Sequence, residues 1–405
     1  MNRRNFLKSA GALSGLGFTS GSATAFPSRP PSVYAELGVK PFINAAGTYT
    51  TLSACVMPKE VQDAMHEAAS THVSIPELQK AFSDRLAPML GCEAALVTAG
   101  CASALSLATA ACVTGKDPEK IRRIPDTSGM KNEVIFQKSH RFGYDHAIRN
   151  AGVKIIEIET PEELQSAVSA RTAMLFFLNL ADPKGKIKRA EFAQIANRLQ
   201  IPCLIDAAAD LPPVENLRDL TRMGYDLAGF SGGKGLRGPQ CSGLLIGKKA
   251  LIEAAFLNGP PYSDTLGRGA KVGKEEIVGL YRALQLYLKT NHAAEWAEWD
   301  QRVAFIDREL STIAGVRTKR FVPEIANHAP HLSVEWDTKQ IPLTPRQIVE
   351  NLRTKDPRIE LRPGSEESKT GIEVAVWMLR PGEEKIVARR LREALHTVVN
   401  PQPRI

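Results

Sequence analysis

Between about residues 90 and 250 the sequence alternates short apolar runs with amphipathic stretches, and this alternation restricts the possible folds more than any other feature. Continuous apolar runs of this length are typical of strands buried on both faces, and the stretches between them suit crossover helices. The pattern therefore predicts an α/β domain of three layers around a mainly parallel seven-stranded sheet. The seven runs are AALVTAG (94–100), VIFQK (134–138), KIIEIET (154–160), TAMLFFLNL (172–180), CLIDAAA (203–209), LAGFSGG (227–233) and SGLLIGK (242–248).

The pattern changes after this region. From residue 274 to about 315 it is helical without strands, and segments such as HLSVEWD and TPRQIVENLRT follow. We therefore expect a small α+β domain at the C-terminus. The predicted organisation is an N-terminal arm (26–57), a large domain (58–290), and a linking helix with the small domain (291–405).

Residues 1–25 are predicted to be a targeting segment rather than part of the fold. Arg3 and Arg4 resemble a twin-arginine motif, a short and weakly hydrophobic stretch follows, and Ala23-Thr24-Ala25 offers a cleavage site. A chance arginine pair is the alternative. The twin-arginine export machinery moves proteins that are already folded, commonly with a cofactor in place. We therefore expect a periplasmic protein that binds a cofactor.

Composition excludes several classes of function. The chain has 405 residues and a formal net charge of +8, and three of the positive charges lie in residues 1–25. The other basic residues alternate with acids, and no basic groove with interleaved aromatic residues is visible, so no nucleic-acid partner is expected. No apolar run of about 18 residues is present, so we expect no membrane span. The six cysteines lack metal-binding spacing, and no metal is predicted.

The ends of the strand-like runs hold the candidate chemistry, because ligands of such sheets bind at the carboxyl ends of the strands. Asp206 lies in the fifth run, and Lys234 follows the sixth, framed by glycines in FSGGKGLRGPQ. Taken singly, Asp206 is equally suited to be a helix N-cap, and Lys234 to be a solvated lysine in a turn. Together, at a separation of 28 residues, they indicate a common site.

This pair resembles the corresponding residues of the aspartate-aminotransferase superfamily, the fold-type-I pyridoxal-phosphate enzymes. The resemblance implies pyridoxal 5'-phosphate as the cofactor and Lys234 as the catalytic residue that forms a Schiff base with it. It also implies that Asp206 keeps the pyridine nitrogen protonated, so that the ring acts as an electron sink. Ala208 is expected to border the cofactor as well.

Small residues follow the first run and lead into a helix. Gly100, Cys101, Ala102 and Ser103 allow backbone N–H groups and the helix N-terminus to hold a phosphate, and a plain N-cap is the alternative. The resemblance adds the hydroxyl of Ser231 as a second phosphate ligand.

Two more contacts follow from the resemblance. His140, after the second run, is expected to stack on the cofactor ring, with a structural His140, or His146 in its place, as alternatives. Asn179, after the fourth run, is expected to meet the phenolic oxygen of the cofactor. Asp182 or a simple Asp-Pro turn are the alternatives there.

Further segments narrow the resemblance to one branch. FINAAGT (42–48), GRGAKVGKEE (267–276) and WMLRPGEE (377–384) are similar to the group that contains bacterial selenocysteine synthase and enzymes like D-glucosaminate-6-phosphate ammonia-lyase. Selenocysteine synthase itself is not expected. Its additional tRNA-binding domain has no room in the 18 residues between the predicted cleavage site and Asn44.

The resemblance implies that Asn44 and Thr48 face the substrate, with a loop turn as the alternative. Arg362 and Arg380 are candidates for the substrate carboxylate, because a guanidinium binds a carboxylate in bidentate fashion, and solvated surface positions are the alternative. Arg268 is expected to reach the cofactor phosphate or the substrate, in a homodimer or larger homo-oligomer with shared active sites.

The expected reaction is α,β-elimination from an amino acid or amino-acid-like substrate, giving a keto acid and ammonia. Transamination, racemisation and aldol cleavage start from the same chemistry and are the alternatives. An alternative of another class is a non-catalytic periplasmic binding protein that retains the fold. The presence of both Asp206 and Lys234 argues against it.

Overall fold

The computed structural model describes residues 32–363 and 371–396. The predicted signal peptide (1–25) therefore lies outside the described residues. All seven predicted strands form and belong to one sheet. They are β2 (Ala94–Thr98), β3 (Glu133–Gln137), β4 (Lys154–Ile158), β5 (Thr172–Leu178), β6 (Cys203–Asp206), β7 (Leu227–Ser231) and β8 (Gly243–Gly247).

The sheet has the order β2-β8-β7-β6-β5-β3-β4. Strand β8 is antiparallel to both of its neighbours, β2 and β7, and every other pair is parallel. The prediction of a mainly parallel sheet is thus confirmed. Because β5, β6 and β7 are parallel neighbours, their carboxyl ends lie side by side at one edge of the sheet.

Helices cover both faces of this sheet, since alternate residues of its strands point to two separate cores. Leu175 and Phe177 of β5 belong to one core, and Phe176 belongs to the other. The first core is closed by α3 (Ile75–Leu90), α8 (Arg189–Leu199), α9 (Asn216–Arg222) and α11 (Lys274–Lys289). The second is closed by α4 (Gly100–Thr114), α6 (His146–Arg149) and α10 (Lys249–Leu257).

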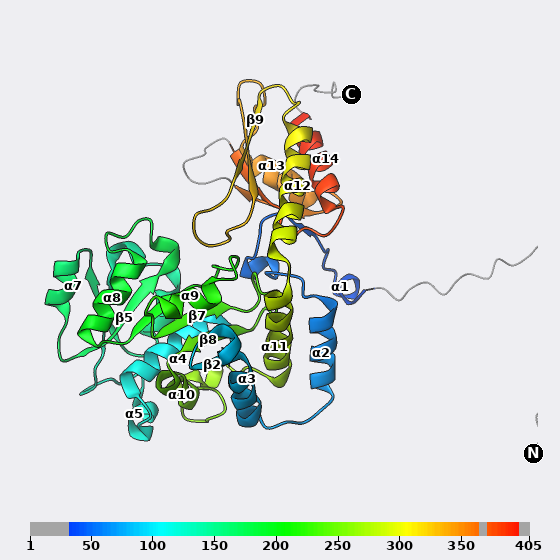
Figure 1. Ribbon diagram of the computed structural model, residues 1–405. Helices are drawn as coiled ribbons and strands as arrows, with labels where there is room; N and C mark the ends of the chain where they lie inside the picture. Colours follow the sequence, from blue (N-terminus) through cyan, green and yellow to red (C-terminus); the bar gives the residue numbers. More distant parts are fainter. Residues whose placement is uncertain (1–31, 364–370, 397–405) are drawn as a thin grey trace, which may run out of the picture. The chain divides into compact units, whose positions relative to one another are not determined.

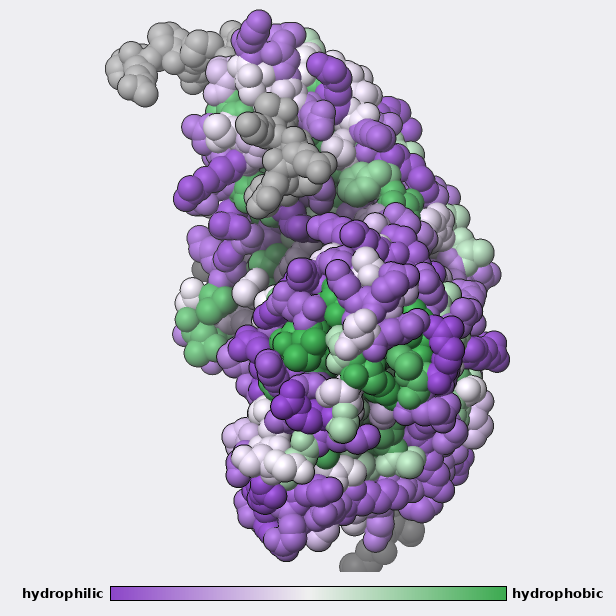
Figure 2. All heavy atoms as spheres, turned by 90° about the vertical axis from the view of Figure 1, so that its left-hand side faces the viewer, coloured by the Kyte–Doolittle hydropathy of each residue, from purple (hydrophilic) through white to green (hydrophobic). Residues whose placement is uncertain are grey.

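Shorter helices complete this part of the chain. Helix α2 (Lys59–Ala69) lies beside α11 (Figure 1). In the space-filling view of Figure 2, one face of the molecule is mostly hydrophilic, and hydrophobic residues gather in one region of it. The remaining helices of this part are α2 (Lys59–Ala69), α5 (Pro118–Arg123) and α7 (Pro161–Ala167).

The C-terminal part has a core of its own around Trp299, Leu332 and Trp377. A four-stranded antiparallel sheet in the order β12-β13-β10-β9 packs with three helices, which confirms the small α+β domain. Its elements are α12 (His292–Leu310), β9 (Val316–Phe321), β10 (His331–Trp336), α13 (Pro345–Thr354), β12 (Arg362–Pro363), β13 (Gly371–Ala375) and α14 (Glu383–His396).

A pairing between distant segments joins the N-terminal arm to this core. Strand β1 (Ile43–Asn44) runs parallel to β11 (Ile359–Glu360), and the side chains of Ile43 and Ala45 belong to the C-terminal core. The described residues before Phe42 form a separate part with helix α1 (Val33–Glu36). Across the described ranges, no helix has both the length and the apolar character that a membrane crossing requires.

Candidate active site

Asp206 ends β6 as a buried carboxylate with 6% of its surface exposed. Its Oδ1 accepts hydrogen bonds from the backbone N–H of Ala208 (2.9 Å) and from the Cys101 thiol (3.8 Å). No donor from the described part of the chain reaches Oδ2. Burial raises the pKa of Asp206, while the Ala208 N–H, the charge of Lys234 and the Cys101 thiol oppose the rise. The site therefore favours a cation against Oδ2.

A second buried carboxyl, Asp210, lies four residues further on and is 3% exposed. Its Oδ2 accepts a hydrogen bond from Nδ2 of Asn179 at 2.8 Å, and Nη1 of Arg189 lies 3.5 Å from Oδ1 of the same carboxamide. Asp210 and Arg189 were not predicted from the sequence. A second acid four residues after the strand-terminal Asp206, in the segment DAAAD, is the signal that could have marked Asp210.

Lys234 is half-buried in the tight loop between β7 and β8. Burial raises the pKa of Asp206, Asp210 and Cys101, and the charge of Lys234 opposes this rise at all three groups. The loop has no room for side chains at its glycines. A Cβ on Gly235 would lie 2.0 Å from the carbonyl oxygen of Leu211, which explains why glycines frame the lysine.

The predicted phosphate cradle is the start of α4. Gly100 begins the helix with φ +77°, and no side chain caps its free N–H groups. Gly243 of β8 packs against this turn, where a Cβ would lie 2.3 Å from the carbonyl carbon of Gly100. Cys101 and Ser103 are buried, Ala102 is exposed, and Ser231 is half-buried at the end of β7. A helix start with unpaired N–H groups suits an anion.

His140 lies deep in the protein, with no exposed surface. Its Nδ1 accepts a hydrogen bond from the backbone N–H of Leu178 (3.1 Å), and its Nε2 lies 3.1 Å from Nε2 of Gln137. The ring meets Phe177 edge-on, with 4.4 Å between the centroids. Burial lowers the pKa of His140 to about 4. This placement favours the structural role that was the alternative, and stacking on a cofactor stays a prediction.

The two residues expected to face the substrate differ in their surroundings. Asn44 closes a turn: its Oδ1 accepts from the N–H groups of Ala46 and Gly47, and its Nδ2 donates to the carbonyl of Gly47. This geometry favours the turn interpretation. Thr48 is buried, and its hydroxyl lies 3.4 Å from Oδ1 of Asn327.

Asn327 connects the small domain to the strand ends. Its N–H donates to the carbonyl of Ala209 at 2.7 Å, between the two buried acids of the site. Both Asn327 (φ +48°) and the preceding Ala326 (φ +57°) adopt the left-handed conformation. Such a conformation is uncommon for residues other than glycine and tends to occur at functional sites. Asn327 was missed because no sequence motif marks it.

The three candidate arginines are not brought together. Arg362 lies over the ring of Tyr49, with 4.9 Å between its Cζ and the ring centroid. Tyr49 directly follows Thr48 in the chain. Arg380 is exposed, with its backbone N–H bonded to Glu383. Arg268 is exposed and donates to the carbonyl of Pro260 at 2.8 Å. Of the three, Arg362 is tied to the site through neighbouring contacts, and the roles of the other two stay predictions.

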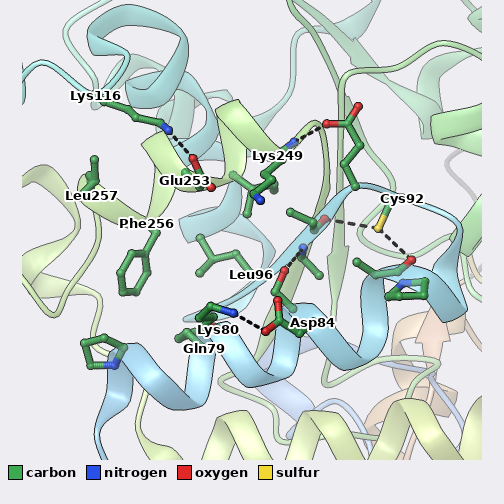
Figure 3. Close-up of a pocket in the computed structure, with 18 residues that line it drawn as sticks. Gln79, Lys80, Asp84, Cys92, Leu96, Lys116, Lys249, Glu253, Phe256 and Leu257 are labelled. Carbon is green, nitrogen blue, oxygen red and sulfur yellow. Dashed lines mark hydrogen bonds and ion pairs between the residues drawn. The ribbon is translucent and has the colours of Figure 1, made fainter.

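A separate cavity of about 630 Å³ lies between α3, β2 and α10 (Figure 3). Ion pairs between Lys80 and Asp84 and between Lys116 and Glu253 line it, beside the apolar side chain of Phe256. It borders the amino-terminal half of β2, and none of the predicted site residues lines it. The strand ends are therefore the better candidate for catalysis.

The residues at the strand ends fit pyridoxal phosphate. The free Oδ2 of Asp206 suits a protonated pyridine nitrogen, the half-buried amine of Lys234 suits an aldehyde carbon, and the uncapped start of α4 suits a phosphate. Within the described ranges, no group of three or more His, Cys, Asp or Glu residues that could hold a metal ion is present. Fold and site together define the class of the protein as a fold-type-I pyridoxal-phosphate enzyme.

Comparisons with known proteins agree with this class. The chain belongs to the family described as "SelA: L-seryl-tRNA selenium transferase", which matches residues 42–313. A D-glucosaminate-6-phosphate ammonia lyase from Salmonella typhimurium is 28% identical over 379 residues, 90% of this chain and 98% of that protein. A 5'-C-glycyluridine monooxygenase-decarboxylase from Streptomyces sp is 30% identical over 376 residues, 89% of this chain and 92% of that protein.

A solved structure extends the similarity to the fold. The structure of a D-glucosaminate-6-phosphate ammonia-lyase matches with a TM-score of 0.80 and 27% identity, over 92% of this chain and 100% of that one. The predictions of the fold and of pyridoxal phosphate as the expected cofactor are confirmed by these similarities. The individual site residues remain predictions.

Proposed function

We propose that the chain is a lyase that catalyses α,β-elimination from an amino acid or amino-acid-like substrate and releases a keto acid and ammonia. The observation that carries the proposal is the placement of Asp206 and Lys234 at the ends of two neighbouring strands, with the carboxylate within reach of the lysine charge. The similarity to an ammonia lyase along 90% of this chain supports elimination over transamination, racemisation or aldol cleavage.

In this proposal each part of the cofactor has its own partner. Lys234 holds the cofactor through a Schiff base, Asp206 holds the pyridine nitrogen, and the N–H groups at the start of α4 hold the phosphate together with Ser231. The bound cofactor supplies an electron sink for the charge that develops at the α-carbon of the substrate. Asp206 accepts a cationic partner readily, because burial makes an unpaired carboxylate costly.

The chain's own residues move the proton and orient the substrate. With the cofactor bound, Nζ of Lys234 would be displaced by the substrate amine and would then be free to accept the α-proton as a general base. The substrate would lose the leaving group on its β-carbon together with the bonding electron pair, and hydrolysis of the carbon–nitrogen bond would give the keto acid and ammonia. Arg362 binds the substrate carboxylate in this proposal, because it lies over the ring of Tyr49, and Tyr49 is adjacent in the chain to Thr48, whose hydroxyl contacts Asn327.

The test is an assay for ammonia and keto acid on a panel of L- and D-amino acids, without any amino acceptor. We expect wild-type protein loaded with pyridoxal phosphate to release both products in equal amounts, and Lys234→Ala to release neither. The matched control is Lys249→Ala, which removes an exposed lysine at the opposite edge of the sheet. Product formation only after an amino acceptor is added would contradict elimination.

A second candidate comes from the 30% identity to the monooxygenase-decarboxylase. An enzyme of that kind consumes molecular oxygen and releases carbon dioxide from an amino-acid carboxylate. Anaerobic assays separate the two candidates. Elimination continues without oxygen, whereas oxygenation stops and leaves no carbon dioxide.

We also propose that the protein is exported to the periplasm by the twin-arginine route and acts there as a homo-oligomer. The support for export is Arg3-Arg4 with the hydrophobic stretch and cleavage site that follow. Cell fractionation tests it. The protein is expected in the periplasm, and the double substitution Arg3→Lys with Arg4→Lys is expected to keep it in the cytoplasm, while Lys8→Gln leaves export intact.

A further inference from the structure

Arg237 follows Lys234 in the loop between β7 and β8, which we call the lysine loop (232–242). Its backbone N–H donates to the carbonyl of Lys234 at 2.9 Å, so the two residues share one turn. Its backbone is left-handed, with φ +54°. This conformation is uncommon for a residue with a side chain, and it persists where the surroundings hold it in place. Neither the proposed reaction nor the predicted cofactor contacts use the side chain of Arg237.

The guanidinium of Arg237 leaves the lysine loop and binds two other elements. Its Nη2 donates to the carbonyl of Trp377 at 3.0 Å and lies 3.4 Å from Oε1 of Glu295. Trp377 lies in the turn that follows β13 of the small domain, and Glu295 is a half-buried residue of α12. One charged nitrogen thus contacts both a carbonyl and a carboxylate, and charged donors make the stronger hydrogen bonds. The side chain therefore joins the lysine loop to the C-terminal part of the chain.

The segment that Arg237 binds is itself fixed in the fold. Trp377 is 1% exposed and belongs to the C-terminal core. Two residues earlier, the N–H of Ala375 donates to the carbonyl of Ala45 in the N-terminal arm at 2.8 Å. The carbonyl of Trp377 therefore belongs to a segment that the small domain and the arm hold together.

We propose that Arg237 is a positioning residue that holds the lysine loop, and with it the amine of Lys234, in place against the arm and the small domain. The inference rests on the proposed function, because it needs Lys234 to be the residue that binds pyridoxal phosphate. The amine comes from the large domain, whereas the substrate is predicted to contact the arm and the small domain. Arg237 connects these two sides of the site directly.

Alignment of the amine is what this contact provides. Without the bridge, the turn that contains Lys234 loses its two partners outside the large domain, and the loop samples more positions. A displacement of about 1 Å in a reacting group lowers a rate by about 100-fold. The N–H groups at the start of α4, which are proposed to hold the phosphate, stay as they are. A residue with a purely structural role would alter stability without changing this rate.

The experiment follows the visible band that forms when the full chain without cofactor is mixed with increasing concentrations of pyridoxal phosphate. In this step the amine of Lys234 condenses with the aldehyde and water leaves. The limiting rate at saturation reports the condensation, and the concentration at half the limiting rate reports the binding that precedes it. Arg237→Asn keeps a residue that tolerates the left-handed backbone and is too short to reach Trp377. We expect its limiting rate to fall roughly tenfold or more, with an unchanged half-saturating concentration.

Two further variants and a second measurement separate positioning from stability. Arg237→Lys keeps the charge and the reach and is expected to recover most of the limiting rate. Glu295→Gln is expected to lower it less than Arg237→Asn, because the bond to Trp377 remains. Hydrogen exchange of residues 232–242, measured without cofactor, is expected to be faster in Arg237→Asn. Arg282→Asn is the matched control, since it removes an exposed arginine of α11, and it should follow wild type in both measurements.

The outcomes distinguish this inference from the proposed function. A limiting rate in Arg237→Asn equal to that of wild type, whatever its melting temperature, overturns the inference and leaves the proposed function standing. If Arg237→Asn does not fold, the limiting rate of Glu295→Gln decides in the same way. A wild-type protein that forms no visible band with pyridoxal phosphate, or a band that survives in Lys234→Ala, overturns both.

Discussion

Burial acts in opposite directions on the pKa values of the acids and the histidine behind the site, because it favours the neutral form of each. It raises the pKa of Asp206 and Asp210 and lowers that of His140. A carboxyl in such a place needs a cation to stay charged, and Lys234 supplies one. His140 has neutral partners on both ring nitrogens and needs no charge. The two acids are therefore candidates for a role that involves charge, whereas the buried and neutral His140 suits a structural role.

His140 makes the stability of the fold depend on pH. Its pKa falls from 6.5 to about 4, so between these values the unfolded chain takes up a proton that the folded protein refuses. The free energy of unfolding therefore decreases as the pH drops through this window, by up to about 3 kcal/mol from this residue. Asp210, whose pKa is raised, acts in the opposite sense, because its contribution is lost as the pH rises toward about 7.

Urea unfolding of wild type and His140→Asn from pH 7 to pH 4 isolates the histidine. Asparagine keeps an acceptor for the Leu178 N–H but does not titrate, so its unfolding free energy should fall less steeply with decreasing pH. The exposed His66 on α2 provides the control, and His66→Asn should follow wild type. Parallel curves for His140→Asn and wild type would show that the ring is not held neutral.

At the scale of elements, close backbone packing positions the start of α4. Strand β8 passes so near to this turn that Gly243 has no room for a Cβ. An antiparallel strand inserted between β2 and β7 thereby supports the helix end that is proposed to hold the phosphate. The helix that is proposed to hold the anion and the strand that supports it are far apart in sequence.

Gly243→Ala tests this support. The new methyl group would lie 2.3 Å from the Gly100 carbonyl carbon and 2.7 Å from the Cys101 nitrogen, so the helix start must shift. We expect a loss of about 1–3 kcal/mol in the free energy of unfolding, together with weaker binding of pyridoxal phosphate in a fluorescence titration. Gly143→Ala is the control, since no atom lies within 4 Å of its Cβ position. Unchanged cofactor affinity in Gly243→Ala would contradict the role of this contact.

At the scale of the whole molecule, two cores far apart along the chain meet at the site. The loop that follows β9 reaches the end of β6 through the Asn327 N–H and the Ala209 carbonyl. The arm residue Thr48 contacts Asn327 as well, and Arg362 lies over the adjacent Tyr49. The side of the site that is predicted to face the substrate would thus be built from the arm and the small domain together.

Asn327 should tolerate glycine better than alanine. Both substitutions remove the contact with Thr48, but alanine also disfavours the left-handed backbone, at a cost of about 1 kcal/mol. We expect Asn327→Gly to raise the KM of the elimination reaction with little loss of stability, and Asn327→Ala to lower the melting temperature in addition. Equal melting temperatures for the two variants would show that the backbone conformation of this loop contributes nothing.

Local sequence was enough to locate the strands and to mark the pair predicted to react. Each buried strand shows a continuous apolar run; Asp206 lies in the fifth run, as the last residue of β6, and Lys234 directly follows the sixth run. A glycine-framed lysine and a strand-terminal acid are properties of short segments, so they can be recognised without coordinates. The resemblance to a known family extended these signals to a cofactor and a reaction class.

The amino-acid sequence was thus sufficient to predict the number of strands in the large sheet, the class of the fold and the pair expected to bind the cofactor, because these depend on the types of neighbouring residues. The folded protein was needed to show the order of the strands, the pairing of β1 with β11, the hydrogen bond between Asn179 and Asp210, and the contact of Asn327 with the strand ends. Each of these joins segments separated by tens to hundreds of residues. Such contacts are selected by the packing of whole elements, which no local pattern records.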